Sequence, residues 1–258
     1  MDNKKKVADQ FGSNAANYVT SKTHAKGKDL NLVEELVNNR ENRSLLDIAT
    51  GGGHVANKLA PFFNQVTALD LTPQMLENAK SFIESNGHQN VSFVQGDAEA
   101  LPFPDKHFDT VTCRIAPHHF SKVDRFISES YRVLTEDGLF ILIDNVSPEV
   151  DEYDKFYNEV EIKRDPSHHR AYKKSEWVSW LEKEGFSVST ISVFEKRFVF
   201  DEWCRMMNLP SGIKEDLNRF MIESASDIKE FFSIEVEEEK VQSFQGEAML
   251  LAAYKKRR

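Results

Sequence analysis

Five short apolar runs separated by helical segments dominate the first 150 residues of this 258-residue chain. The runs are rich in aliphatic or β-branched residues and end in polar ones, which is typical of buried parallel strands. Strands that alternate with helices in this way are expected to form a parallel sheet with right-handed crossovers. The predicted strands are 44–49, 65–70, 91–96, 108–116 and 138–146, and the predicted helices are 54–63, 72–87 and 123–138.

The pattern changes after residue 147. A polar helical stretch with a break at "RDPSHHR" (164–170) leads to a strand-like alternation at 187–200 and to a second helical region at 201–232. An apolar strand then runs from Ala248 to Tyr254. We therefore predict a doubly wound α/β sheet that is closed by a final antiparallel pair of strands, with a helical insertion between them.

Charge and cysteine content restrict the partners and the compartment. Lys and Arg number 33 against 42 Asp and Glu, a net charge of −9, which argues against a nucleic-acid backbone or an anionic membrane as the main partner. No apolar leader and no apolar stretch of about 18 residues is present, so no export signal and no membrane span are predicted. Cys113 and Cys204 are not paired by spacing, which predicts a reduced, cytoplasmic protein. The oligomeric state is left open.

A glycine-rich stretch, "LLDIATGGGHVANKLA" (45–60), is compatible with two cofactors. From Gly51 it fits the G-x-G-x-x-A fingerprint of nicotinamide-dinucleotide enzymes, whereas from Asp47 it fits the D-x-A-x-G-x-G loop of S-adenosylmethionine (SAM) enzymes. The carboxylate of Asp47 would repel a pyrophosphate but would pair with the α-ammonium of SAM. Asp47 therefore favours SAM.

Two further carboxylates follow the next two predicted strands. Asp70 ends the second strand, where it can accept both ribose hydroxyls of an adenosine, although it could instead cap the following helix. After the third strand, Asp97 can accept the exocyclic amine of adenine while the backbone NH of Ala98 meets a ring nitrogen. Because ligands of such sheets bind at the carboxyl ends of the strands, these residues are expected to share one ligand.

The runs "LLDIATGGGHVA", "VTALDLTPQML", "GDAEALPFPDKHFDTVTCRIAPHHF" and "RVLTEDGLFILID" together resemble class I SAM-dependent methyltransferases, specifically the ubiquinone/menaquinone-type branch of small-molecule enzymes. The resemblance implies a Rossmann-like, seven-stranded, mostly parallel sheet with an antiparallel last strand. It also implies that "FGSNAANY" (11–18) belongs to a lid that places Tyr18 over the cofactor. The cofactor-binding residues that the resemblance and the loop chemistry assign are Tyr18, Asp47, Ala49, Gly51, Gly53, Asp70, Leu71, Met75, Asp97, Ala98 and Arg114.

Histidines are the candidate catalytic residues. His118 and His119 follow the fourth strand, where a histidine could remove a proton from a hydroxyl or a carbon acid near neutral pH. The alternative for this pair is a surface position or packing at a helix start. His168 lies in "RDPSHHR", which could orient an anionic or oxygen-rich acceptor or could simply be a salt-bridged helix break. The spacing of the histidines matches no metal-binding motif, so no metal is predicted.

The prediction is therefore a cytoplasmic enzyme that transfers the methyl group of SAM to carbon, oxygen or nitrogen of a small-molecule acceptor. An NAD-dependent oxidoreductase and a non-catalytic SAM-binding protein are the alternatives. We expect a single domain in three parts: an N-terminal helical lid segment (1–40), a SAM-binding core (41–147), and the rest of the sheet with a helical insertion that covers the substrate (148–258).

Overall fold

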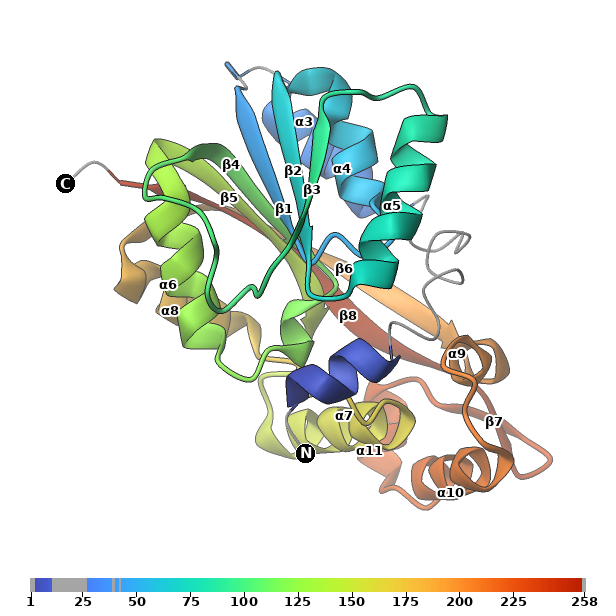
Figure 1. Cartoon of the computed structure of the whole chain (residues 1–258). Helices are drawn as coiled ribbons and strands as arrows, with labels where there is room; N and C mark the ends of the chain where they lie inside the picture. The colour runs from blue at the N-terminus through green and yellow to red at the C-terminus, as the bar shows by residue number, and fades with distance from the viewer. Residues whose placement is uncertain (1–2, 11–26, 39, 42, 257–258) are drawn as a thin grey trace.

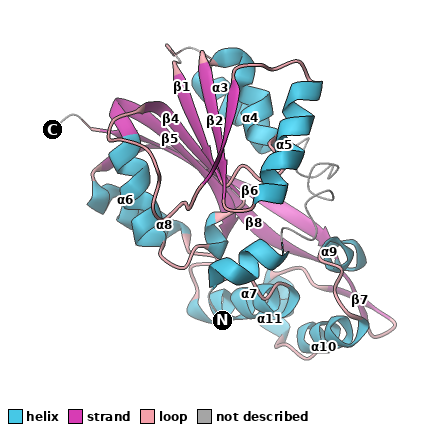
Figure 2. Ribbon diagram, viewed as in Figure 1, coloured by secondary structure: helices cyan, strands magenta, loops and turns pink. Residues whose placement is uncertain are grey.

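A mixed sheet forms the centre of the computed structural model, which describes residues 3–10, 27–38, 40–41 and 43–256 (Figures 1 and 2). The strand order is β3-β2-β1-β4-β5-β8-β6, and the short strand β7 pairs with β8. The strands are β1 (Ser44–Ile48), β2 (Gln65–Asp70), β3 (Val91–Gln95), β4 (Phe108–Arg114), β5 (Leu134–Val146), β6 (Phe186–Val199), β7 (Glu235–Glu237) and β8 (Lys240–Lys255).

Helices cover both faces of this sheet (Figure 2). One core contains side chains of α3 (Lys28–Val37), α4 (His54–Leu59), the short turn η1 (Ala60–Phe62) and α5 (Pro73–Ser85). The other core contains side chains of α6 (Val123–Val133) and α8 (Lys174–Glu184). Successive strand residues such as Leu45 and Leu46 belong to opposite cores, because side chains alternate across a strand. This explains why the central strands β1 and β4 are buried along most of their length.

The closing antiparallel pair is confirmed. Strand β8 runs antiparallel to both β5 and β6, and the first five strands are parallel to one another. The insertion between β6 and β8 contains α9 (Phe200–Met206), α10 (Ser211–Ile222), α11 (Ser226–Phe231) and β7. Together with α7 (Asp151–Arg164), this insertion surrounds a third core.

Strand β8 is longer than the sequence predicted, since it begins at Lys240 rather than Ala248. Its first half is polar, and only Val241, Ser243 and Phe244 are buried there. A half-buried alternation of this kind gives a weaker signal than a continuous apolar run, so the extension and its short partner β7 were missed.

The order of the parallel strands reverses between β1 and β4, where an α/β sheet forms its ligand crevice. Residues 3–10 form a helix that crosses near the carboxyl ends of these strands (Figure 1). No helix in the described part of the chain combines the length and the apolar character that crossing a membrane requires. Tyr18 and the "FGSNAANY" segment lie outside the described residues.

Candidate active site

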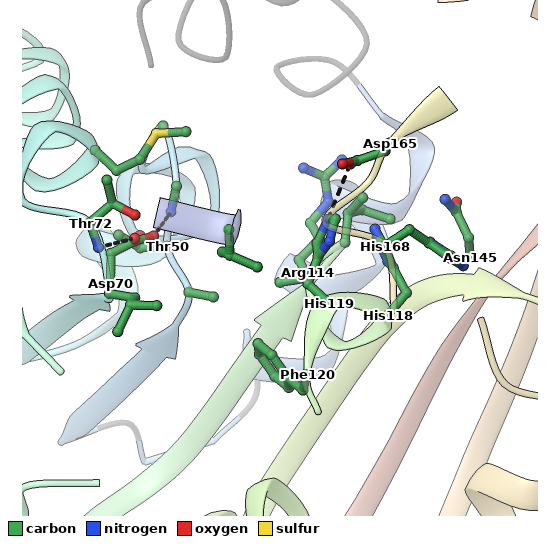
Figure 3. A pocket seen from close by; sticks show the side chains of 18 of the residues that line it. Thr50, Asp70, Thr72, Arg114, His118, His119, Phe120, Asn145, Asp165 and His168 are labelled. Carbon is green, nitrogen blue, oxygen red and sulfur yellow. Dashed lines mark hydrogen bonds and ion pairs between the residues drawn. The ribbon is translucent and has the colours of Figure 1, made fainter. Parts of the chain in front are cut away.

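A cavity of about 300 Å³ lies at the carboxyl ends of the central strands and collects most of the predicted site residues. Gly53 does not line it, and Tyr18 lies outside the described residues. Figure 3 shows Asp70 and Thr72 on one side and the histidines on the other, so the cavity has two chemically distinct halves. The predicted residues that line it are Asp47, Ala49, Gly51, Asp70, Leu71, Met75, Asp97, Ala98, Arg114, His118, His119 and His168.

Asp47 is a buried carboxylate at the end of β1. Its Oδ2 accepts a hydrogen bond from Thr50 Oγ1 at 2.6 Å, and its Oδ1 accepts one from Thr112 Oγ1 at 2.8 Å. Burial raises the pKa of Asp47 to about 6, although the two hydroxyls oppose this shift. The carboxylate is therefore held rigidly, and a cation in the cavity would stabilise its charged form.

The backbone of the loop after β1 turns sharply in the left-handed region. Gly51 has φ +54°, which glycine adopts without steric cost, but Ala49 has φ +52°, where a Cβ is unfavourable. Gly53 also has a packing role. A Cβ there would lie 2.9 Å from Ile83 Cδ1 and 3.0 Å from Ala79 Cβ, so Gly53 permits close packing of α4 on α5.

Asp70, at the end of β2, stabilises the same loop through hydrogen bonds. Its Oδ2 accepts the backbone NH of Gly51 and its Oδ1 accepts that of Thr72, both at 2.9 Å. Thr72 is the N-cap residue of α5 but makes no capping hydrogen bond with its side chain. Asp70 thus has a structural task in addition to lining the cavity, and burial raises its pKa.

Two other predicted cofactor-binding residues, Asp97 and Arg114, form ion pairs with neighbouring side chains. Lys4, on the helix 3–10, places its Nζ 2.6 Å from both Asp97 Oδ2 and Glu99 Oε2. Arg114, at the end of β4, pairs with Asp29 of α3 through Nε and Oδ2 at 2.6 Å. The N-terminal helix is consequently tied to the strand ends that form the cavity.

His118 is fixed by a buried carboxylate at the end of β5. Asp144 Oδ1 lies 2.6 Å from His118 Nδ1, and Asp144 Oδ2 accepts the backbone NH of His118 at 2.8 Å. Burial alone would lower the pKa of His118, but the charge of Asp144 and its hydrogen bond outweigh this effect and raise the pKa. Because the Asp144 carboxylate can only accept a hydrogen bond, the neutral His118 ring carries its proton on Nδ1. The lone pair on Nε2 is then available to act as a base.

His119 and His168 differ from His118 because no carboxylate holds either ring as closely: His119 Nε2 lies 4.0 Å from Asp165 Oδ2, against 2.6 Å between His118 Nδ1 and Asp144 Oδ1. Burial, reinforced by the charge of His118, lowers the pKa of His119 to about 3 and that of His168 to about 2. His119 Nδ1 donates to the Ser167 carbonyl at 3.1 Å, and His168 Nε2 lies 3.1 Å from Asn158 Oδ1. Both rings are therefore neutral near pH 7. The burial of His118 and His119 excludes the surface alternative for this pair.

The "RDPSHHR" segment divides between the cavity and the surface. Arg164, Asp165 and His168 line the cavity, whereas His169 is exposed. Arg170 Nη2 lies 3.0 Å from Asp154 Oδ2, outside the cavity lining. The segment is thus both a helix end and a wall of the site.

Several residues in the cavity lining or directly behind it carry little sequence signal. Asp144 is a carboxylate that interrupts the apolar run "ILIDNV", and this could have identified it as a functional residue. Lys196, Phe198 and Trp203 reach the cavity from β6 and α9, far along the chain. No local pattern indicates that they meet the loop after β1, since the antiparallel closure of the sheet brings them there.

Comparisons with known proteins agree with this geometry. The model of the family described as a methyltransferase domain matches residues 46–142. The chain is 35% identical over 224 residues to the uncharacterised methyltransferase YcgJ of Bacillus subtilis, which covers 87% of this chain and 88% of YcgJ. It is 34% identical over 154 residues to the ubiquinone/menaquinone biosynthesis C-methyltransferase UbiE of Pseudomonas putida GB-1, covering 56% of this chain and 59% of UbiE.

Solved structures give the same result. A crystal structure from Bacillus halodurans C-125, described as a candidate methyltransferase, superposes with a TM-score of 0.88 at 48% identity and covers 90% of this chain and 100% of that one. The crystal structure of YcgJ gives a TM-score of 0.87 at 32% identity over the same shares of the two chains. SAM is therefore the cofactor, and the NAD-dependent alternative does not hold. The chain belongs to the class I SAM-dependent methyltransferases.

Proposed function

We propose that this enzyme methylates a small-molecule acceptor that loses a proton to His118 during the reaction. The observation that carries the proposal is the buried pair of His118 Nδ1 and Asp144 Oδ1, 2.6 Å apart, on the wall of the cavity. An acceptor that needs deprotonation is a hydroxyl or an acidic carbon. The expected reaction is thus O- or C-methylation.

The cofactor half of the cavity suits the groups that SAM presents. Asp47 would pair with the α-ammonium, and the missing Cβ of Gly51 would let the methionine part approach the backbone. Asp70 would accept the ribose hydroxyls, and Asp97 with Ala98 would bind the adenine edge. Bound SAM supplies an electrophilic methyl group on a good leaving thioether. The protein then contributes mainly alignment, which can be worth roughly 7 to 11 kcal/mol.

His118 supplies the base and Asp144 keeps it oriented. Nε2 of His118 accepts the acceptor's proton as the new bond to the methyl carbon forms, and Asp144 stabilises the imidazolium that results. Neutral His119 and His168 line the same wall without competing for that proton, because their pKa values are about 3 and about 2. One histidine of the three predicted is thus assigned as the catalytic base.

A small acceptor is favoured over a macromolecule by the coverage of the site. Lys4 and Val7 of the helix 3–10 and Trp203 and Met206 of the insertion all line the cavity. Together with the net charge of −9, this coverage disfavours an extended anionic polymer. We further propose that residues 1–40 act as the lid, 41–147 as the SAM-binding core and 148–258 as the acceptor-covering part, in a cytoplasmic enzyme.

Radiolabelled SAM incubated with the enzyme and a fractionated bacterial extract tests this function. The label is expected in the low-molecular-weight fraction, and His118→Gln is expected to lower the rate by roughly 10²- to 10⁴-fold without changing SAM affinity. Label that accumulates in the protein or RNA fraction would refute the small acceptor. An unchanged rate in the variant would refute the base.

A further inference from the structure

Five lysine and arginine side chains line the cavity, and four of them form an ion pair with a carboxylate of the described residues. Lys4, Arg114, Arg164 and Arg197 each form an ion pair with an acidic side chain. Lys196 of β6 forms none with the acidic groups of residues 3–10, 27–38, 40–41 and 43–256. Lys196 is half-buried, and an ammonium group with reduced access to water and no ion pair is unfavourable. Lys196 is therefore the cavity cation best placed to receive an anion from a ligand.

The one hydrogen-bond partner of Lys196 in this part of the chain extends the same site. Lys196 Nζ donates to Asn145 Oδ1 at 2.8 Å. Because an ammonium can only donate, this contact fixes the Asn145 amide with its oxygen toward Lys196 and leaves Nδ2 as a donor. Asn145 also lines the cavity and is labelled in Figure 3 near His118. An ammonium and an amide NH₂ group side by side form a natural binding site for a carboxylate.

The electrostatic surroundings favour one negative charge over two. The charges of Glu161 and Asp144 both act on Lys196, and burial lowers the pKa of the Lys196 ammonium. A phosphate dianion would add its second charge beside these two carboxylates. A single carboxylate avoids that repulsion while still neutralising Lys196.

The remainder of the wall beside Lys196 is apolar. Lys196 Nζ lies 5.6 Å from the centre of the Phe198 ring, and Phe198 in turn packs against Trp203 with ring centres 6.0 Å apart. Met206 and Met207 continue this lining. The acceptor half therefore offers a basic end and an apolar surface, as expected for an amphipathic ligand.

We propose that Lys196 and Asn145 bind the carboxylate of the methyl acceptor, which is a small amphipathic carboxylic acid with its body against Phe198 and Trp203. This inference rests on the proposed function and names its substrate class. Asp144 and Asn145 are consecutive residues of β5, so one strand end holds both the carboxylate that orients His118 and part of the anchor. The carboxylate is not itself methylated in this arrangement; a separate hydroxyl or acidic carbon faces His118.

Calorimetry on the enzyme loaded with S-adenosylhomocysteine tests the anchor without requiring turnover. The probes are salicylate, mandelate and hydroxyphenylacetate, their methyl esters, and phenyl phosphate. At least one acid is expected to bind more tightly than its methyl ester and more tightly than phenyl phosphate. The Lys196→Met substitution is expected to raise the Kd of that acid by roughly 10- to 100-fold. Lys196→Arg should retain part of the preference, and Lys183→Met on α8, outside the cavity lining, should retain all of it.

Several results would overturn the anchor. The anchor would be refuted if the acids and their esters bound equally well, or if Lys196→Met bound the acids as tightly as the wild type does. It would also be refuted if phenyl phosphate bound more tightly than the acids, or if none of the acids bound. SAM affinity is measured in every variant and should not change. Acid binding that persists while no methyl transfer is found would count against the His118 mechanism instead, and transfer to neutral acceptors alone would count against the anchor.

Discussion

Asp47 lies at the end of β1 with 1% of its surface exposed, and its pKa is raised to about 6 from 3.8. For a carboxyl whose folded pKa is raised, the protonated form favours folding, so stability is lost as the pH rises from about 4 to about 6. The shift corresponds to roughly 3 kcal/mol at neutral pH in the absence of a bound cation. This cost falls on the residue that we propose pairs with the SAM ammonium.

Asp47→Asn is therefore expected to be more stable than the wild type at about pH 8, by roughly 3 kcal/mol, and to lose this advantage near pH 4. Denaturant unfolding at the two pH values measures the difference. Asp109→Asn, which alters a partly buried carboxylate that accepts the backbone NH groups of Arg43 and Ser44 at the opposite strand ends, is the control. A variant less stable than the wild type at both pH values would contradict the assigned pKa.

Ala49 adopts φ +52° in the loop after β1, a conformation that costs a non-glycine residue roughly 1 kcal/mol. Ala49→Gly is expected to raise the midpoint of thermal unfolding, because glycine adopts this conformation without the strain. Scanning calorimetry measures the change. A lower midpoint in the variant would show that the alanine methyl group contributes packing that outweighs the strain.

Residues that line the cavity could be predicted from the sequence where one short motif identifies them. Asp47 and Asp70 were selected because each ends a recognisable strand, and both reach the cavity. His118 was selected, but its distinction from His119 depends on Asp144, which lies 26 residues away in sequence. Lys4 and Lys196 were missed because their environment arises only when the N-terminal helix and β6 meet the strand ends.

At the scale of elements, the helix 3–10 is tied to both halves of the cavity. Lys4 contacts Asp97 and Glu99 on the cofactor side, and Asn3 Nδ2 donates to the His119 carbonyl at 2.8 Å on the acceptor side. The sequence predicted a lid from a resemblance at residues 11–18, which the structure does not describe. The adjoining helix 3–10 contacts both sides of the cavity.

Lys4→Met is expected to accelerate amide hydrogen exchange in residues 3–10, because it removes both ion pairs while leaving the strands unchanged. Exchange of the β1 amides is the internal control. Lys5→Met is the matched variant, since Lys5 is exposed on the same helix. Equal exchange in Lys4→Met and the wild type would show that Asn3 and the apolar contacts hold the helix without Lys4.

At the scale of the whole molecule, the alternation of strands and helices was sufficient to predict the doubly wound sheet and its antiparallel closure. The sheet order β3-β2-β1-β4-β5-β8-β6 follows from right-handed crossovers and a single reversal. The arrangement of the insertion could not be predicted, because its packing depends on a third core in which α7 meets α9 and α10. Trp203 and Met206, which line the cavity, come from this unpredicted part.

Ligand-dependent stability is a property of the whole chain, since a ligand that binds only the folded state stabilises it by mass action. SAM at about one hundred times its Kd is expected to add roughly 2.7 kcal/mol, and NAD at the same concentration is expected to add nothing. Thermal unfolding with each ligand measures the two effects. A shift with NAD that equals the shift with SAM would contradict the assignment of the Asp47 loop.

The most direct test of the account is the pH dependence of the single-turnover methyl-transfer rate in the wild type, His118→Gln and Asp144→Asn, with an acceptor isolated by the labelling experiment. In the wild type the rate should rise with pH through the raised pKa of His118, because only the neutral ring accepts a proton. Asp144→Asn should move this rise to lower pH and reduce the maximum rate, and His118→Gln should abolish the rise. The same pH dependence in all three proteins would contradict the role of His118 as the base.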